Sequence, residues 1–178
     1  MFIWVGIDVD SQLNEIKEGT KTVENELNFK HSNFTLPLHI SLKISFEVEE
    51  NIFQNVIEDI LEVYSQTKPF EIRTKAISCE NNISWIRMED NQMLLDLSKN
   101  INSLMLTKYN IPLHEYDTDY KFHTTLFMDD DCEKVKQAYT KIQHIPVPRH
   151  LTAERFLIGI SDSGELGTYR IYKTVTKS

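Results

Sequence analysis

"PLHISLKISF" at residues 37–46 is one of two strand-like stretches in which a histidine is followed, two positions later, by a hydroxyl residue. The other is "KFHTTLFMD" at residues 121–129. Side chains alternate between the two faces of a β-strand, so residues i and i+2 project from the same face. Each stretch therefore predicts an amphipathic strand whose histidine and hydroxyl lie side by side.

The polar faces of these two predicted strands hold the groups His39, Ser41, His123 and Thr125. Strict alternation also adds Lys43 to the first face and Lys121 to the second. Either lysine could bring positive charge to a ligand site, and solvent exposure at a strand end is the alternative. If the two strands lie side by side, the histidines and hydroxyls form one cluster of four.

The rest of the chain predicts an α+β protein. Helical periodicity, weak in the first case, covers residues 8–28 and 47–66, and further helices are predicted at residues 91–109 and at 129–143, where Asp residues suit a helix start. Further strands are predicted at residues 2–10, 70–80 and 83–89 and in a C-terminal hairpin. Asn81-Asn82 and the segment from Ser163 to Gly167 suit the turns of hairpins. Residues 112–120 predict a loop. The order of helix, motif strand, helix and hairpin recurs, which indicates a degenerate internal duplication.

Composition and charge limit the classes of function. The chain has 178 residues, 40% of them hydrophobic and 26% charged, as is typical of a globular protein. We expect residues 1–178 to form a single domain. The formal net charge of −8 argues against a protein that coats long duplex nucleic acid. It is compatible with binding of a short anionic ligand in a local cationic pocket.

Targeting segments and metal motifs are not evident in the sequence. The start "MFIWVGIDVD" lacks the positive charge of a signal peptide, and no apolar run is long enough for a membrane span, so we expect a cytoplasmic protein, as a monomer. The two cysteines, Cys79 and Cys132, predict neither a disulfide nor a zinc site. No metal-like spacing connects the remaining histidines, which are His31, His114, His144 and His150.

Two histidines beside two hydroxyls suit the cleavage of a phosphodiester. The pKa of imidazole lies near 6.5, so one histidine can accept a proton while the other donates one at neutral pH. One deprotonates the attacking hydroxyl or water, and the other protonates the leaving oxygen. The two hydroxyls can donate hydrogen bonds to the non-bridging phosphate oxygens. This chemistry requires no metal or other cofactor.

At these residues the chain resembles the 2H phosphoesterase superfamily, which is defined by two His-x-Thr/Ser-x motifs with an apolar last residue. The motifs here are His39-Ile40-Ser41-Leu42 and His123-Thr124-Thr125-Leu126, 84 residues apart. The first motif uses Ser where Thr is commoner, which the family tolerates. The resemblance covers essentially the whole chain and extends to RNA 2′,3′-cyclic phosphodiesterases, also called 2′-5′ RNA ligases, and to enzymes that cleave 2′-5′ oligoadenylates.

This resemblance implies a fold and a set of roles. The fold would be the bilobal 2H phosphoesterase arrangement, with two antiparallel sheets flanked by helices and related by a pseudo-two-fold axis. Each lobe would lend one motif strand to a central cleft. His39 and His123 would be the acid/base pair, and Ser41 and Thr125 would contact the phosphate.

Four other residues are candidates for substrate binding. On the last predicted strand, Arg170 and Tyr172 could hold a phosphate and stack a base, and the polar outer face of a terminal strand is the alternative. Trp4 on the first strand and Phe127, in phase with Thr125, could form walls that stack bases. Core packing is the favoured alternative for both.

Two classes of function follow from the motifs. The first is a metal-independent phosphodiesterase that acts on 2′,3′-cyclic phosphate ends or on 2′-5′ linked or cyclic oligonucleotides, with ligation as the reverse reaction. The second is a binding module in which the same residues hold a small nucleotide or short oligonucleotide without turnover. The sequence does not choose among the substrates.

Overall fold

The computed structural model describes residues 1–29, 36–118 and 120–177 of the chain. Its strands are β1 (Phe2–Asp8), β2 (His39–Glu47), β3 (Phe70–Glu80), β4 (Ile83–Met88), β5 (His123–Met128), β6 (His150–Ala153), β7 (Arg155–Ser161) and β8 (Arg170–Thr176). Its helices are the short 3-10 helix η1 (Asp10–Gln12), α1 (Asn14–Leu27), α2 (Glu50–Gln66), α3 (Gln92–Tyr109), α4 (Glu115–Thr118) and α5 (Cys132–Ile142). Within the described residues, no helix combines the length and apolar character needed to cross a membrane.

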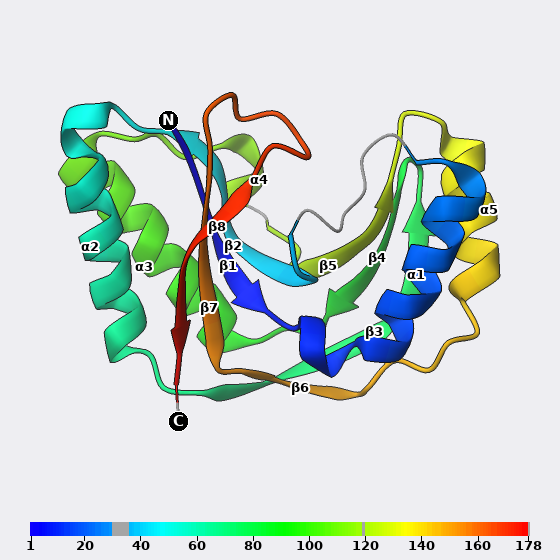
Figure 1. Cartoon of the computed structure of the whole chain (residues 1–178). Helices are drawn as coiled ribbons and strands as arrows, with labels where there is room; N and C mark the ends of the chain where they lie inside the picture. The colour runs from blue at the N-terminus through cyan, green and yellow to red at the C-terminus, as the bar shows by residue number, and fades with distance from the viewer. Residues whose placement is uncertain (30–35, 119, 178) are drawn as a thin grey trace.

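The strands form two antiparallel sheets that stand side by side as two lobes (Figure 1). The first sheet has the order β2-β1-β7-β8, and the second has the order β5-β4-β3-β6. Helices α2 and α3 lie on the outer side of the first sheet, and α1 and α5 lie on the outer side of the second. The predicted α+β, bilobal fold is confirmed.

The two lobes do not correspond to the two halves of the sequence. The β3–β4 hairpin follows the first motif but belongs to the sheet of the second, and the C-terminal β7–β8 hairpin returns to the sheet of the first motif. Helix α1 likewise leaves β1 to pack against α5. This exchange gives each sheet a motif strand as its outermost strand, and β2 and β5 approach each other between the lobes.

The face of each sheet toward its helices is the main core. In β1, Ile3, Val5 and Ile7 are fully buried on this helix face. Tyr64 of α2 stacks on Phe156, which lies opposite Ile7 in the neighbouring strand β7. The intervening residues of β1 therefore project from the other face, which we call the inner face.

The turn signals act as the sequence predicts, and Asp131 caps a helix. Asn81 adopts a left-handed φ of 51° in the β3–β4 hairpin, and Gly164 and Gly167 adopt φ values of 76° and 82° between β7 and β8. The side chain of Asp131 accepts hydrogen bonds from the N–H groups of the first turn of α5. Such positions favour Asn, Gly and Asp because these residues tolerate positive φ or cap free amides.

The strict alternation predicted for both motif strands is wrong after the hydroxyl residue. Ser41 lies opposite Gly6 but Lys43 lies opposite Val5, so β2 contains one extra residue there. Strand β5 has the same shift, because Thr125 lies opposite Trp85 whereas Phe127 lies opposite Ser84. A bulge of this kind reverses which face the following side chains occupy.

Two short elements were not anticipated. The predicted loop at residues 112–120 contains the four-residue helix α4, and residues 150–153 form the edge strand β6. Both lack a periodic run long enough to recognise in a sequence. Strand β6 forms because it pairs with β3, with His150 opposite Arg73.

Candidate active site

The two motif histidines occupy equivalent places at the starts of edge strands, His39 in β2 and His123 in β5. Both imidazoles are partly buried, as are the hydroxyl residues Ser41 and Thr125 two positions later. The histidines are close enough to interact electrostatically. We call these four residues the motif site.

Backbone carbonyls fix the same tautomer in both histidines. The Nδ1–H of His39 donates to the carbonyl of Pro37 at 2.8 Å, and the Nδ1–H of His123 donates to the carbonyl of Lys121 at 2.6 Å. A carbonyl oxygen only accepts, so the proton of each neutral ring is on Nδ1. Nε2 of each ring is left with its lone pair, as a base requires.

The environment of the motif site favours neutral imidazoles. Burial lowers the pKa of His39 to about 4, with a smaller lowering from the charge of His123, and the Pro37 carbonyl opposes this. Burial also lowers the pKa of His123, and the nearby charge of Arg87 lowers it further. Both causes disfavour the imidazolium form. Each histidine can therefore accept a proton at neutral pH.

Each motif histidine contacts one of the two tryptophans in the chain. The ring centroids of Trp4 and His39 are 4.3 Å apart, and those of Trp85 and His123 are 4.7 Å apart. Trp4 also donates its indole N–H to Oγ of Ser41 at 2.9 Å. It thus contacts both polar residues of the first motif.

Two glycines make room for the indole of Trp4 on the inner face. A Cβ atom on Gly6 would lie 2.5 Å from Cζ2 of Trp4, and one on Gly159 would lie 2.8 Å from its Cε3. Only residues without a side chain let the ring lie this close to the sheet. Trp4 is 6% exposed, so its ring supports the motif site rather than forming an open stacking wall.

Tyr120 connects the two motifs. Its ring lies 5.7 Å from that of His123, and its hydroxyl forms a side-chain hydrogen bond with Ser41 of the other lobe. Burial raises the pKa of Tyr120 to about 12, and the bond to Ser41 opposes that rise. The hydroxyl therefore stays protonated and can act as a hydrogen-bond donor.

The strands beside the motifs give the site an unequal charge. Asp8 lies opposite His39 and has its carboxylate 3.3 Å from Nη2 of Arg155. Arg87 lies opposite His123, and its guanidinium is 3.7 Å from Glu80 and 5.9 Å from the Trp85 ring. The second motif thus has a cation beside it whose nearest acid, among the described residues, lies beyond hydrogen-bond distance.

The bulges move two predicted site residues away from the motif site. Lys43 is 2% exposed and donates to Asp117 at 2.7 Å and to Asn102 at 2.8 Å. Phe127 is fully buried and stacks on Phe29. Both lie four residues after a motif histidine, where the extra strand residue turns them to the helix face.

The structure also locates the other predicted contacts. Arg170 and Tyr172 lie on β8, the strand of the first sheet farthest from β2. Arg170 is opposite Ile160 and 3.4 Å from Asp162, and the Tyr172 ring packs against Phe53 of α2, so neither is beside the motif residues. The side chain of Lys121 is exposed just before His123.

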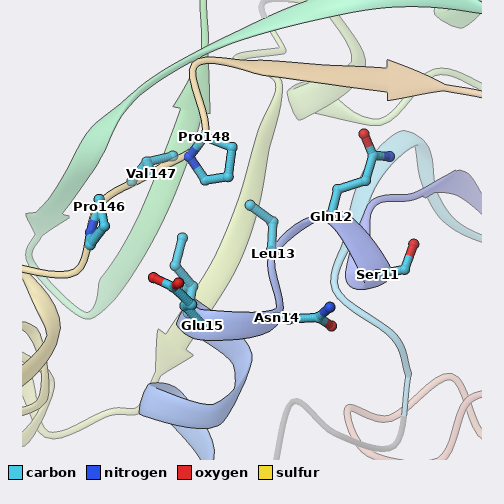
Figure 2. A pocket seen from close by; sticks show the side chains of 9 residues that line it. Ser11, Gln12, Leu13, Asn14, Glu15, Pro146, Val147 and Pro148 are labelled. Carbon is cyan, nitrogen blue, oxygen red and sulfur yellow. The ribbon is translucent and has the colours of Figure 1, made fainter.

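No group of three or more potential metal ligands occurs among His, Cys, Asp and Glu in the described part of the chain. His31 lies outside the described residues, and His150 pairs with Glu71 at 3.0 Å. A separate pocket of about 380 Å³ lies where η1 and α1 meet the Pro146–Pro148 segment (Figure 2). Its wall contains neither motif, so we assign it no part in the chemistry.

Sequence reasoning missed Trp85, Arg87 and Tyr120. Trp85 and Arg87 alternate on one predicted strand, a weak signal, but only the β4–β5 pairing reveals that they face the second motif. Tyr120 lies in a predicted loop, three residues before His123. Nothing in the sequence indicates that it reaches Ser41 in the other lobe.

Comparison with known proteins identifies the family and the fold. The family model of the 2′-5′ RNA ligase superfamily matches residues 8–165. Among solved structures, TT0787 of Thermus thermophilus has 15% identity and a TM-score of 0.67, covering 99% of this chain and 97% of that one. E. coli LigT, solved in complex with 3′-AMP, has 14% identity and a TM-score of 0.59, with 99% and 97% coverage.

At these identities the solved structures show a shared fold. No curated protein matches at the level of sequence. The family match spans most of the chain and includes both motifs, as expected from the resemblance to 2H phosphoesterases. The chain therefore belongs to the 2′-5′ RNA ligase superfamily of 2H phosphoesterases, which supports a phosphoesterase-type activity.

Proposed function

We propose that this protein is a metal-independent phosphodiesterase that uses His39 and His123 as its base and acid. It would act on 2′,3′-cyclic phosphate ends or on 2′-5′ linked or cyclic oligonucleotides. The observation that carries the proposal is that both imidazoles have the same tautomer. Each donates its Nδ1–H to a backbone carbonyl, which leaves Nε2 available for proton transfer. A pair of this kind, one from each lobe, suits the two sides of a phosphate.

The reaction on a cyclic phosphate balances without a cofactor. The oxygen of water forms a bond to phosphorus, and the bond between phosphorus and one ribose oxygen breaks. One histidine accepts the proton of the water, and the other gives a proton to the departing ribose oxygen. The product is a phosphomonoester beside a free ribose hydroxyl. Attack by the hydroxyl of a second strand in place of water would be ligation.

His39 is the base in this proposal. Its pKa of about 4 leaves Nε2 unprotonated at neutral pH, as proton acceptance requires. His123 is the acid. Burial and Arg87 lower its pKa in the free protein, and an anionic phosphate bound beside it would raise that pKa toward the value that proton donation needs.

Hydroxyls and one cation would hold the phosphate. Ser41 and Thr125 lie on the same strand faces as the histidines and can donate to the non-bridging oxygens. Arg87, opposite His123, supplies positive charge in a chain whose formal net charge is −8. A local cation of this kind favours a short anionic substrate over a long duplex.

A nucleotide is the favoured substrate class. E. coli LigT, which shares the fold, is solved with 3′-AMP, with ATP and with NADP+. By analogy we propose that the motif site of this chain takes a small nucleotide or the end of a short oligonucleotide. The 2′,3′-cyclic phosphate and the 2′-5′ phosphodiester both present a phosphorus atom next to a ribose oxygen that the acid can protonate.

The test is to incubate the purified protein with a 2′,3′-cyclic nucleotide, a 2′-5′ oligoadenylate and a panel of cyclic dinucleotides, and to separate the products. We expect a phosphomonoester from at least one of them. His39→Ala and His123→Ala should each lower kcat/KM by roughly 10² to 10⁴-fold. Binding of all three without any product would support a nucleotide-binding module instead, and near wild-type turnover by either variant would refute the two-histidine mechanism.

A change of leaving group separates the acid from the base. An aryl ester of a nucleoside phosphate has a leaving oxygen that departs without being protonated. We expect His123→Ala to recover much of its activity on such an ester, because the acid is no longer needed, and His39→Ala to stay inactive because the base still is. The opposite pattern would reverse the assignment.

A further inference from the structure

A buried ion pair connects the strand of the first motif to the segment that leads into the second. Nζ of Lys43 lies 2.7 Å from Oδ2 of Asp117, and their side chains are 1% and 2% exposed. Lys43 follows Ser41 by two residues, and Asp117 in α4 precedes His123 by six. The pair therefore spans the two motifs at points close to both.

Each end of this ion pair is anchored in its own element. Lys43 also donates to Oδ1 of Asn102 in α3, at 2.8 Å. The neighbouring carbonyl of Leu42 accepts from Oγ of Ser98, also in α3, at 2.6 Å. At the other end, Oδ2 of Asp117 accepts the backbone N–H of His114 at 2.9 Å. Helix α3, β2 and α4 are thus joined through two buried charges.

Stability alone does not account for such an arrangement. Removing two charges from water costs several kcal/mol per ion, and replacing a buried pair by apolar residues of similar size is often neutral or stabilising. A buried pair does fix the relative position of the two elements that carry it, because its hydrogen bonds are satisfied in only one arrangement of those elements. The elements in question carry the two motifs.

We propose that the Lys43–Asp117 pair is a positioning device that sets the placement of His123 and Tyr120 relative to His39 and Ser41. This inference rests on the proposed function, since the geometry it fixes is that of the motif site. The pair attaches α4 to β2. The chain then enters β5 with the Tyr120 hydroxyl hydrogen-bonded to Ser41 and the Tyr120 ring beside the His123 ring. Without the pair, α4 loses this polar attachment to β2, and the placement of the second motif against the first then depends only on the Tyr120–Ser41 bond and the contacts between β2 and β5.

The decisive variant is Lys43→Met/Asp117→Leu, which replaces both charges by apolar groups of similar size. We expect its midpoint of thermal unfolding to lie clearly above those of Lys43→Met and Asp117→Leu alone, which each leave an unpaired buried charge. It should lie somewhat below that of the wild type, because the buried Oδ1 of Asn102 loses its donor. We expect kcat of the double variant to fall by about tenfold or more with a smaller change in KM, since a displacement of about 1 Å can cost a factor of 10².

Lys108→Met is the control for loss of a lysine ion pair away from the motifs, at a more exposed position. Lys108 of α3 forms an ion pair of 2.6 Å with Asp59 of α2, so it connects two helices on the same lobe. We expect this variant to keep wild-type kcat and KM. A merely structural role for the Lys43–Asp117 pair predicts instead that the double variant regains wild-type kcat together with its stability, and that result would overturn the proposal.

A second measurement does not depend on turnover. Titration of the histidine ring protons by NMR in the ligand-free protein gives the pKa of His39, which the charge of His123 and burial both lower. In the double variant we expect this pKa to rise by about 0.5 unit or more toward 6.5, because both effects weaken when the lobes shift. An unchanged pKa, or an unfolded double variant, would contradict the positioning role. Failure of the wild type to turn over any substrate would count against the proposed function alone.

Discussion

The indole N–H of Trp4 donates a 2.9 Å hydrogen bond to Oγ of Ser41, and the same ring lies edge-on to His39. We predict that Trp4→Phe lowers kcat/KM by roughly 2- to 12-fold, which corresponds to the free energy of one hydrogen bond, because Ser41 loses the indole N–H that helps to orient it. Trp85→Phe is the matched control, since Nε1 of Trp85 is buried without a hydrogen-bond partner among the described residues. Steady-state kinetics of the two variants should differ, and equal losses would contradict this role for Trp4.

The Trp4 ring lies so close to the sheet that position 6 should require glycine. We expect Gly6→Ala to destabilise the protein by about 1 to 3 kcal/mol and to reduce activity, since the new methyl group would lie 2.8 Å from the Ile40 carbonyl oxygen and displace the Trp4 ring. A Cβ on Gly19 in α1 would lie closer than 3.0 Å to Cδ1 of Ile145, the movable end of a flexible side chain, and in ordinary contact with Ile142. We therefore expect Gly19→Ala to be neutral or stabilising by up to about 1 kcal/mol. Chemical denaturation of both variants measures the difference.

We expect a bell-shaped dependence of kcat/KM on pH. The acid limb should reflect the pKa of His39, about 4, and the alkaline limb that of His123, which is lowered from 6.5, so the optimum of kcat/KM should lie below pH 6.5. Because the two rings interact, each limb gives an apparent pKa of the coupled pair rather than the pKa of one residue alone. Arg87→Met removes a cation that disfavours protonation of His123, so its alkaline limb should move to higher pH, while kcat/KM falls. If the alkaline limb of this variant did not move, Arg87 would be excluded as a cause of the lowered pKa of His123.

Stability should also depend on the state of His39. Its pKa is about 4 in the folded protein and near 6.5 in the unfolded chain, so the unfolded chain binds more protons between these values. The free energy of unfolding therefore decreases as the pH falls from 6.5 to 4, by about 1 to 3 kcal/mol from this residue. His39→Gln should lack that contribution. Denaturation curves at pH 7 and pH 4 should show a smaller difference for the variant, and equal differences would contradict the assigned pKa.

Chelation tests the metal-independent mechanism. We expect turnover to survive an excess of EDTA, because in the proposed mechanism two imidazoles supply both proton transfers and Arg87 supplies positive charge near the phosphate. The control is a zinc-dependent phosphodiesterase assayed in the same buffer. Loss of activity in EDTA that zinc or manganese restores would refute the mechanism.

Local patterns in the sequence determine much of this protein. The alternation in residues 37–42 and 121–126 predicts both motif strands and the shared faces of histidine and hydroxyl, because pleating depends only on the backbone. A helical stripe predicts α2, and Asp residues suited to a helix start mark α5. The positive φ of Asn81 and Gly164 follows from the few residues that adopt it at low cost. The two-motif pattern with its family resemblance also identifies the superfamily.

Tertiary structure decided where these elements meet. Lys43 and Phe127 follow the two histidines by the same four positions, and alternation assigns both to the motif faces. Each is instead buried on the helix face, because β1 and β4 pair with the motif strands through a register that holds one extra residue. Register depends on the partner strand and on what each face can bury, so it is not encoded in the motif strand itself. The same holds for Trp85, Arg87 and Tyr120, whose positions beside the motifs arise from contacts between segments far apart in the chain.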